Sequence, residues 1–134
     1  MTKDLNKLLK QYTSEPINNK VMKWADISIM EWGGVCGDII EVFLKINDGK
    51  LEEMSYMWNI SKTTKWAASL YSDMLVGRDI DDIMELDKNT LQEKWLNIPT
   101  IKKSSMMLPL LAIINAIYKY KNQNVKVILD DLLM

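Results

Sequence analysis

Residues 39–58 have the sequence IIEVFLKINDGKLEEMSYMW, and this stretch decides the fold. Its first half alternates hydrophobic side chains with others, which is the pattern of a β-strand with one buried face. The positions on that face are Ile40, Val42, Leu44 and Ile46. Asn47-Asp48-Gly49 follows and favours a hairpin turn, because Asp and Gly tolerate the positive backbone angles that tight turns need. Lys50–Trp58 is therefore the return strand of an antiparallel pair.

Segments on either side of the hairpin predict one more strand and several helices. Ala25–Glu31 has alternating isoleucines and is expected to be the first strand. Thr63–Val76 and residues 104–121 repeat hydrophobic side chains at helical spacing, and Gly77 stands where a helix commonly ends. The tail, residues 122–134, fits either a strand or a helix. Shorter helices are expected at residues 4–12, after Asp79 and after Asn89.

This order of elements, with strands first and helices after, is typical of the α+β class. A sheet of this size is not stable alone, so helices are expected to cover one of its faces. We therefore predict a small antiparallel three-stranded sheet with helices packed on one face. The chain has no internal repeat, low-complexity run or linker, and residues 1–134 are expected to form a single domain.

The composition argues against several classes of partner. Of the 134 residues, 48% are hydrophobic and 26% are charged, as is typical of globular proteins. The net charge of −1 gives no reason to expect nucleic acid or an anionic membrane as a partner. No segment approaches the length of a membrane span, and Met1–Lys10 lacks the apolar core of a secretory signal. Because a single cysteine cannot form an internal disulfide, a cytoplasmic location is expected.

The chain contains no histidine. This removes histidine-based catalytic triads, H-E-x-x-H zinc sites and imidazole acid–base catalysis together. No glycine-rich loop that would cradle a phosphate group is present either. Since no complete catalytic set is visible, the chain is not expected to be an enzyme.

The segment before the hairpin, residues 31–38, reads EWGGVCGD and carries the candidate functional residues. It holds the only cysteine and three of the five glycines of the chain. Glycine permits backbone angles that other residues resist, so this cluster predicts a shaped loop that presents Cys36 and Asp38. A thiol and a carboxylate two residues apart at the start of a strand suggest metal or sulfur chemistry. The alternative is a tight turn with a buried, inert cysteine.

Several motifs in this order resemble the IscU/NifU N-terminal family of iron–sulfur cluster assembly scaffolds. The strongest is Cys36-Gly37-Asp38 followed by the hairpin, and Tyr12 with Pro16 resembles the family's H-Y-x-x-P segment. The resemblance continues along most of the chain. Its further segments are Ser69–Gly77, Asp87–Thr90, Ile98–Lys102 and Ala116–Lys121.

The resemblance implies a ligand set that this chain holds only in part. Family scaffolds present three cysteines from three loops, together with an aspartate two residues after the first. Cys36 and Asp38 match the first cysteine and the aspartate, but the other two cysteine positions fall on Ser61 and Ser105. The histidine that precedes the third cysteine falls on Ser104. A serine hydroxyl is a hard, normally protonated donor and a poor substitute for a thiolate on iron or zinc.

Cys36 and Asp38 are therefore the predicted metal and cofactor ligands, and they give two donors where a stable site normally has four. We expect no cofactor on a monomer. Two protomers could pool their thiols and carboxylates to share iron, zinc or an iron–sulfur cluster, so a homo-oligomer is a possible assembly. Which metal is bound, if any, stays open at this point.

Four lysines lie in or beside the segments that would converge with Cys36. A nearby cation lowers the pKa of a thiol, so Cys36 could accept a sulfur atom as a persulfide without binding metal. The alternative is an ordinary solvated surface. The four residues are Lys62, Lys65, Lys102 and Lys103.

The resemblance thus implies a diverged iron–sulfur cluster assembly scaffold with Cys36 as a residual sulfur acceptor or partial metal ligand. Its partners would be a cysteine desulfurase or a sister scaffold. An Hsp70-type chaperone is a further expectation, because Ile98–Lys102 resembles the L-P-P-V-K segment that such chaperones bind. Thr100 replaces the second proline, and a helix-ending loop is the alternative there. The competing function is a non-catalytic protein-interaction module that keeps the fold and no longer binds metal.

Overall fold

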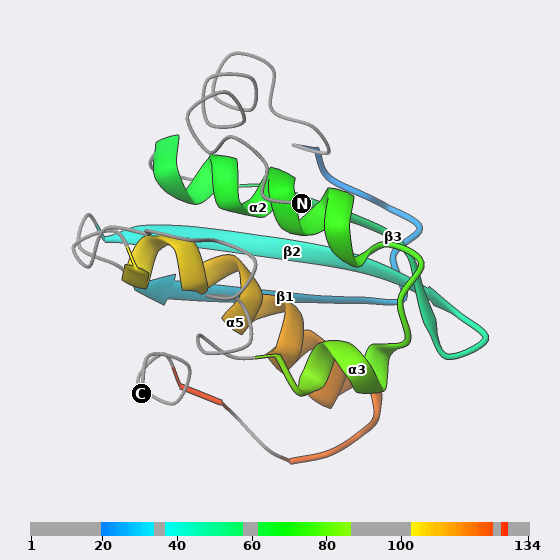
Figure 1. Ribbon diagram of the computed structural model, residues 1–134. Coiled ribbons are helices and arrows are strands. Elements are labelled where there is room, and N and C mark those ends of the chain that lie inside the picture. Colours follow the sequence, from blue (N-terminus) through cyan, green and yellow to red (C-terminus); the bar gives the residue numbers. More distant parts are fainter. Residues whose placement is uncertain (1–19, 34–36, 58–61, 87–102, 125–126, 129–134) are drawn as a thin grey trace, which may run out of the picture.

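The computed structural model describes residues 20–33, 37–57, 62–86, 103–124 and 127–128. Lys62, Thr63 and residues 103–106 are described by their backbone alone. Three strands are followed by three helices along this part of the chain (Figure 1). The elements are β1 (Ile27–Gly33), β2 (Asp38–Asn47), β3 (Lys50–Met57), α2 (Lys62–Leu75), α3 (Ile80–Met84) and α5 (Lys103–Tyr120).

The strands form one antiparallel sheet in the order β1-β2-β3. The predicted hairpin is confirmed, since Asn47 pairs with Lys50 and both Asp48 and Gly49 adopt positive φ angles, 54° and 73°. The first strand begins and ends two residues later than predicted, at Ile27 and Gly33. It extends this far because its pairing with β2 continues to the Gly33–Asp38 pair.

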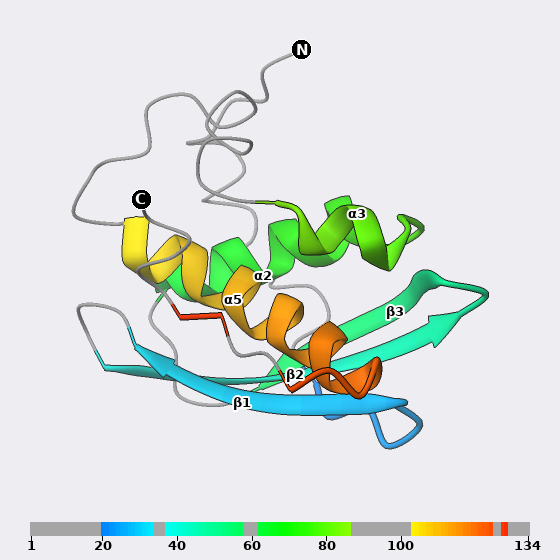
Figure 2. The ribbon, with the colours of Figure 1, turned by 90° about the horizontal axis from the view of Figure 1, so that it is seen from below.

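All three helices lie on the same face of the sheet (Figure 2). The alternating hydrophobic residues of β2 point toward them and are at most 6% exposed. The predicted α+β fold, a small antiparallel sheet covered on one face by helices, is therefore confirmed. Among the described residues, no helix combines the length and the apolar character that crossing a bilayer requires.

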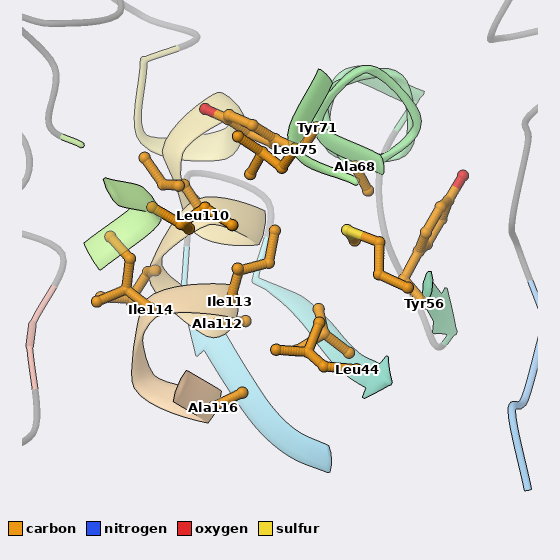
Figure 3. Packing of buried hydrophobic residues seen from close by; sticks show 14 of the residues in the cluster. Leu44, Tyr56, Ala68, Tyr71, Leu75, Leu110, Ala112, Ile113, Ile114 and Ala116 are labelled. Atoms are coloured by element: carbon orange, nitrogen blue, oxygen red, sulfur yellow. The ribbon is translucent and has the colours of Figure 1, made fainter. Parts of the chain in front are cut away.

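The longest helix, α5, is the centre of the core. The sequence predicted one hydrophobic face, yet every residue from Met107 to Ile117 is buried. The reason is its position: α5 contacts β1 and β2 on one side and α2 and α3 on others. Figure 3 shows Ile113 and Leu110 of α5 between Leu44 of the sheet and Tyr71 of α2. Burying side chains of this size stabilises the fold by about 1.5–3 kcal/mol each.

The connection from α2 to α3 closes part of the outer edge of β3. Leu51 donates its backbone N–H to the carbonyl of Arg78 at 3.0 Å and accepts from Gly77 at 2.7 Å. Ile80 donates to the carbonyl of Gly49 at 3.0 Å, which ties α3 to the hairpin turn. Gly77 has a φ of 96°, a conformation that L side chains rarely adopt, so a glycine suits this helix end.

The other predicted helix limits agree with the structure to within one or two residues, apart from those outside the described part. The α2 helix begins at Lys62 and ends at Leu75, and α3 follows Asp79 as expected. Asp79 occupies the N-cap position with an extended backbone. Its side chain makes no capping hydrogen bond. The helices expected at residues 4–12 and after Asn89 lie outside the described residues, as does most of the 122–134 tail.

Candidate functional site

Asp38 is the first residue of β2, and its backbone pairs with Gly33, the last residue of β1. Gly37 precedes it with a φ of 68°. Because an L side chain is strained at such an angle, a glycine here is what lets the chain turn into β2. Cys36 is the next residue toward the N-terminus and lies outside the described residues, so its predicted role as a ligand stays a prediction.

The carboxylate of Asp38 is buried, with 4% of the residue exposed. It accepts a hydrogen bond from the hydroxyl of Thr64, a fully buried residue in the first turn of α2. A buried carboxylate is costly unless it is hydrogen-bonded, and a hydroxyl donor reduces that cost. The pair thereby fixes the start of β2 against the N-terminal end of α2.

Four element ends meet on this side of the molecule, which we call the cysteine end: the end of β1 and the starts of β2, α2 and α5. Figures 1 and 2 both show them together at one end, opposite the β2–β3 hairpin. Ser105 lies in the first turn of α5, although its side chain is not described. Ser61 directly precedes α2 in the sequence and lies outside the described residues. The structure thus brings together the elements that carry or flank the expected ligand positions.

The donor set of one chain does not fit a resident metal or cluster. One thiol, one carboxylate and no histidine are offered at these positions, whereas zinc and iron–sulfur sites normally use four donors. In the described part of the chain, no three acidic, cysteine or histidine side chains converge. That finding does not test Cys36, because Cys36 lies outside the described part.

The predicted basic character of this end is described only in part. Lys62 and Lys103 open α2 and α5, and their backbones are placed at the cysteine end. Lys65 is half-buried one turn into α2, and its carbonyl accepts a hydrogen bond from Tyr56 at 3.3 Å. Lys102 lies outside the described residues. Whether these ammonium groups face the thiol stays a prediction.

A second buried polar cluster, which the sequence analysis missed, joins β1 to the C-terminal segment. The amide of Asn115 in α5 donates to the carboxylate of Glu31 at 3.1 Å and to the carbonyl of Val127 at 2.9 Å. Its oxygen accepts from the backbone N–H of Val127 at 2.8 Å. Asn115 therefore binds Val127 as a neighbouring strand would. The sequence contained a signal for it, because Asn115 is the one polar residue between Met106 and Ile117 of this helix.

Tyr56 is buried beside α2 and is not placed to act as a base. Its hydroxyl lies 2.6 Å from the hydroxyl of Ser69. Burial raises the pKa of Tyr56 above its ordinary value, and the hydrogen bond with Ser69 offsets part of that rise. The phenol is therefore neutral at physiological pH, and we assign it a structural role.

The three-stranded sheet covered by helices, with a positive-φ glycine leading into a buried aspartate, is the architecture of a small α+β domain. Residues 4–127 match the NifU-like N terminal domain, and the chain belongs to that family.

Two curated relatives are the iron–sulfur cluster assembly scaffold proteins IscU 1 and IscU 2 of Archaeoglobus fulgidus. Each is 23% identical to this chain over 93 residues. The match covers 69% of this chain and 61% of each relative, so the chain spans less than two thirds of their length.

Solved structures share the fold. A nitrogen-fixing NifU-like protein (N-terminal) from Brucella abortus superposes with a TM-score of 0.69 at 14% identity, covering 87% of this chain and 94% of that one. A candidate iron–sulfur cluster assembly scaffold protein for the SUF system from Fervidobacterium islandicum AW-1 gives a TM-score of 0.61 at 13% identity. There the match covers 82% of this chain and 93% of that chain. At these identities the likeness establishes the fold alone.

Proposed function

We propose that this protein is a diverged scaffold of iron–sulfur cluster assembly, in which Cys36 accepts sulfur or serves as a partial metal ligand. Membership of the NifU-like N-terminal family and the names of the curated relatives support this class of function. The observation that carries the proposal is the buried carboxylate of Asp38, held by Thr64 at the cysteine end. Asp38 stands two residues after the only thiol of the chain.

The proposed sulfur step is a transfer between thiols, and its partner is a cysteine desulfurase that carries a persulfide. The Cys36 thiolate attacks the outer sulfur of that persulfide. The sulfur–sulfur bond of the donor breaks, the donor leaves as a thiolate, and Cys36 becomes the persulfide. The step needs no outside oxidant or reductant. Ammonium groups at the starts of α2 and α5 would favour the Cys36 thiolate by lowering its pKa.

Iron, zinc or a cluster enters this proposal as cargo shared between protomers. One chain supplies one thiolate and one carboxylate, and two chains supply the four donors that such a site uses. A sister scaffold could complete the set in the same way. An Hsp70-type chaperone is a further proposed partner through Ile98–Lys102, a segment outside the described residues. We propose no turnover by the chain alone, and a reducing compartment such as the cytoplasm, where the thiol stays free.

The test is anaerobic incubation of the purified protein with a cysteine desulfurase and cysteine, followed by intact-mass analysis. We expect the chain to gain the mass of one sulfur atom, and Cys36→Ser to gain none. A parallel incubation with iron and sulfide, followed by visible absorbance and metal analysis, tests the shared site. A colourless protein whose Cys36 also takes up no sulfur would exclude the proposal.

The second candidate is a protein-interaction module that keeps the fold without the chemistry. The incomplete donor set favours it, because one chain offers one thiol and one carboxylate at positions where metal sites normally use four donors. In that case Cys36→Ser should leave the binding of partners unchanged. A pull-down from cell extract with the wild-type protein and Cys36→Ser as matched baits separates the two candidates.

A further inference from the structure

A groove of about 450 Å³ lies between the C-terminal half of α2, β3 and residues 20–24. Its volume is within the range of ligand sites. Two buried methionines, Met22 and Met54, line it, and each is 2% exposed. The groove is therefore a hollow with an apolar floor, at the end of the molecule that carries the hairpin.

Two partly exposed apolar side chains add to this lining. Trp24 is 54% exposed and Val76 is 40% exposed. A tryptophan that is half open to solvent beside an apolar floor is typical of a surface that buries a partner.

The rim of the groove is acidic. Glu52, Glu53 and Asp73 line it, and Lys20 is the one basic residue among the lining side chains that the structure describes. Carboxylates thus outnumber the cation, although the whole chain is close to neutral with a net charge of −1. The charge of this groove is complementary to a basic ligand.

The aromatic ring of the groove already holds a cation. The ammonium nitrogen of Lys20 lies 5.9 Å from the centroid of the Trp24 ring. The indole N–H of Trp24 donates to the carboxylate of Glu53 at 2.9 Å, which orients the ring. Ammonium and guanidinium groups are attracted to the face of an indole. Lys20 therefore shows in the free protein which kind of group this groove accepts.

We propose that the groove is a docking site for a basic segment of a partner protein, one with a lysine or arginine next to an apolar residue. The cation would replace Lys20 on the Trp24 ring beside Glu53, and the apolar side chain would rest against Val76, the other lining apolar residue that is exposed. Asp73 and Glu52 would then face further basic residues of the segment.

The groove is separate from the cysteine end. Ser72, which also lines the groove, stands about 15 Å further along the axis of α2 than Lys62. A partner in the groove therefore leaves the start of α2 accessible. The inference does not depend on sulfur chemistry, so Cys36→Ser should bind the partner as the wild type does.

The test uses fluorescence anisotropy with a labelled synthetic peptide that repeats Gly-Arg-Leu, and with a control peptide in which Gln replaces Arg. We expect the basic peptide to bind and the uncharged peptide to bind at least about tenfold more weakly. The affinity should also fall as salt is added, because the carboxylates are exposed.

Charge reversal locates the peptide on the protein. Glu52→Lys with Asp73→Lys should weaken binding about tenfold. The matched control is Asp82→Lys with Glu85→Lys, which makes the same change of charge on exposed residues outside the groove lining and should leave binding nearly unchanged. Lys20→Ala should tighten binding several-fold, because it vacates the Trp24 ring.

Three results would overturn the proposal. The two charge-reversed double variants could bind the basic peptide equally well, the wild type could bind the charged and uncharged peptides equally well, or Lys20→Ala could leave the affinity unchanged. Spermine is the competing small polycation, and equal affinity for spermine and the peptide would also overturn docking of a peptide segment. Circular dichroism checks each variant. If the Glu52/Asp73 pair fails to fold, the exposed Lys20→Ala variant decides the question alone.

Discussion

Two aspartates stand at opposite ends of β2 and stabilise the fold in different ways. Asp38, at the cysteine end, is buried and accepts a hydrogen bond from the hydroxyl of Thr64. Asp26, at the hairpin end, is exposed and accepts from the backbone N–H of Ile46 at 2.8 Å. It also pairs with the ammonium group of Lys45 at 3.3 Å. The buried carboxylate needs its hydroxyl partner because it has lost most of its contact with water, whereas the exposed ion pair is solvated and contributes little to stability.

The two ends of the sheet also differ in the kind of hydrogen bond that joins them to the helices. Backbone hydrogen bonds close the hairpin end, where Leu51 pairs with Gly77 and Arg78. At the cysteine end, a contact between side chains joins β2 to α2. The contact at the cysteine end therefore depends directly on the identity of Asp38 and Thr64.

The largest effect is expected from Leu51→Ala at the hairpin end. Leu51 is fully buried, and its truncation should lower the free energy of unfolding by about 3 kcal/mol through lost burial and a cavity. Urea denaturation gives this value. Val21→Ala, at a residue that is 53% exposed, is the control and should change it by less than about 0.5 kcal/mol. A small loss for Leu51→Ala would mean that backbone pairing alone holds this end.

Asp38→Ala should cost about 2 kcal/mol, because the buried hydroxyl of Thr64 then loses this charged acceptor. Combining it with Thr64→Val removes both partners and should restore part of the loss. Urea denaturation of the two single variants and the double variant completes the cycle. Additive losses would contradict the coupling of these side chains at the cysteine end.

Tyr71→Phe probes the core between the two ends. The hydroxyl of Tyr71 contacts the sulfur of Met107 at 3.8 Å, and its loss should cost about 1 kcal/mol at neutral pH. Burial raises the pKa of Tyr71 well above its ordinary value, so the folded protein holds this proton more tightly than the unfolded chain. The free energy of unfolding should therefore fall as the pH rises above about 10, where the unfolded chain loses the proton.

Thermal unfolding across the alkaline range tests this expectation. Tyr71→Phe removes one cause of the loss of stability at alkaline pH. Tyr56→Phe removes a second, since burial raises the pKa of Tyr56 too. Parallel pH profiles for the wild type and the double variant would show that neither hydroxyl is linked to folding.

The smallest effect is expected from Asp26→Asn. The hydrogen bond from Ile46 is the main cause that lowers the pKa of Asp26, with Lys45 contributing. The ionised form therefore stabilises the fold above about pH 3.9, and this contribution is lost as the pH falls through the lower pKa of the folded state. At neutral pH the variant should lose no more than about 1 kcal/mol. A difference from the wild type that grows in acid would contradict this sign.

The sequence predicted the sheet and helices well because their signals are local. Alternation in β2 and the Asp-Gly turn gave the hairpin, and hydrophobic spacing gave α2 to within a residue. The first strand was predicted to stop at Glu31, where the alternation of isoleucines ends. It continues to Gly33 because Trp32 and Gly33 still pair with Ile39 and Asp38 of β2, a contact that no local pattern in β1 shows.

Local patterns could not find the contacts that span the fold. Thr64 was not a candidate, because only the folded chain brings it to Asp38. The burial of α5 on all sides follows from its place between the sheet and α2, which a single-helix pattern cannot express. Of the predicted site, the structure places Asp38 and the helix start that carries Ser105, while Cys36 and Ser61 stay predictions.

The tie between Leu51 and the α2–α3 connection has a consequence for self-association. An open strand edge offers unpaired amide and carbonyl groups on which another chain can build, which is a route to amyloid-like fibres. Leu51 uses both of its outward groups on Gly77 and Arg78, so this stretch of β3 cannot template a foreign strand. The chain thereby lowers its risk of aggregating at the hairpin, where the exposed charges of Lys50, Glu52 and Glu53 also oppose strand addition.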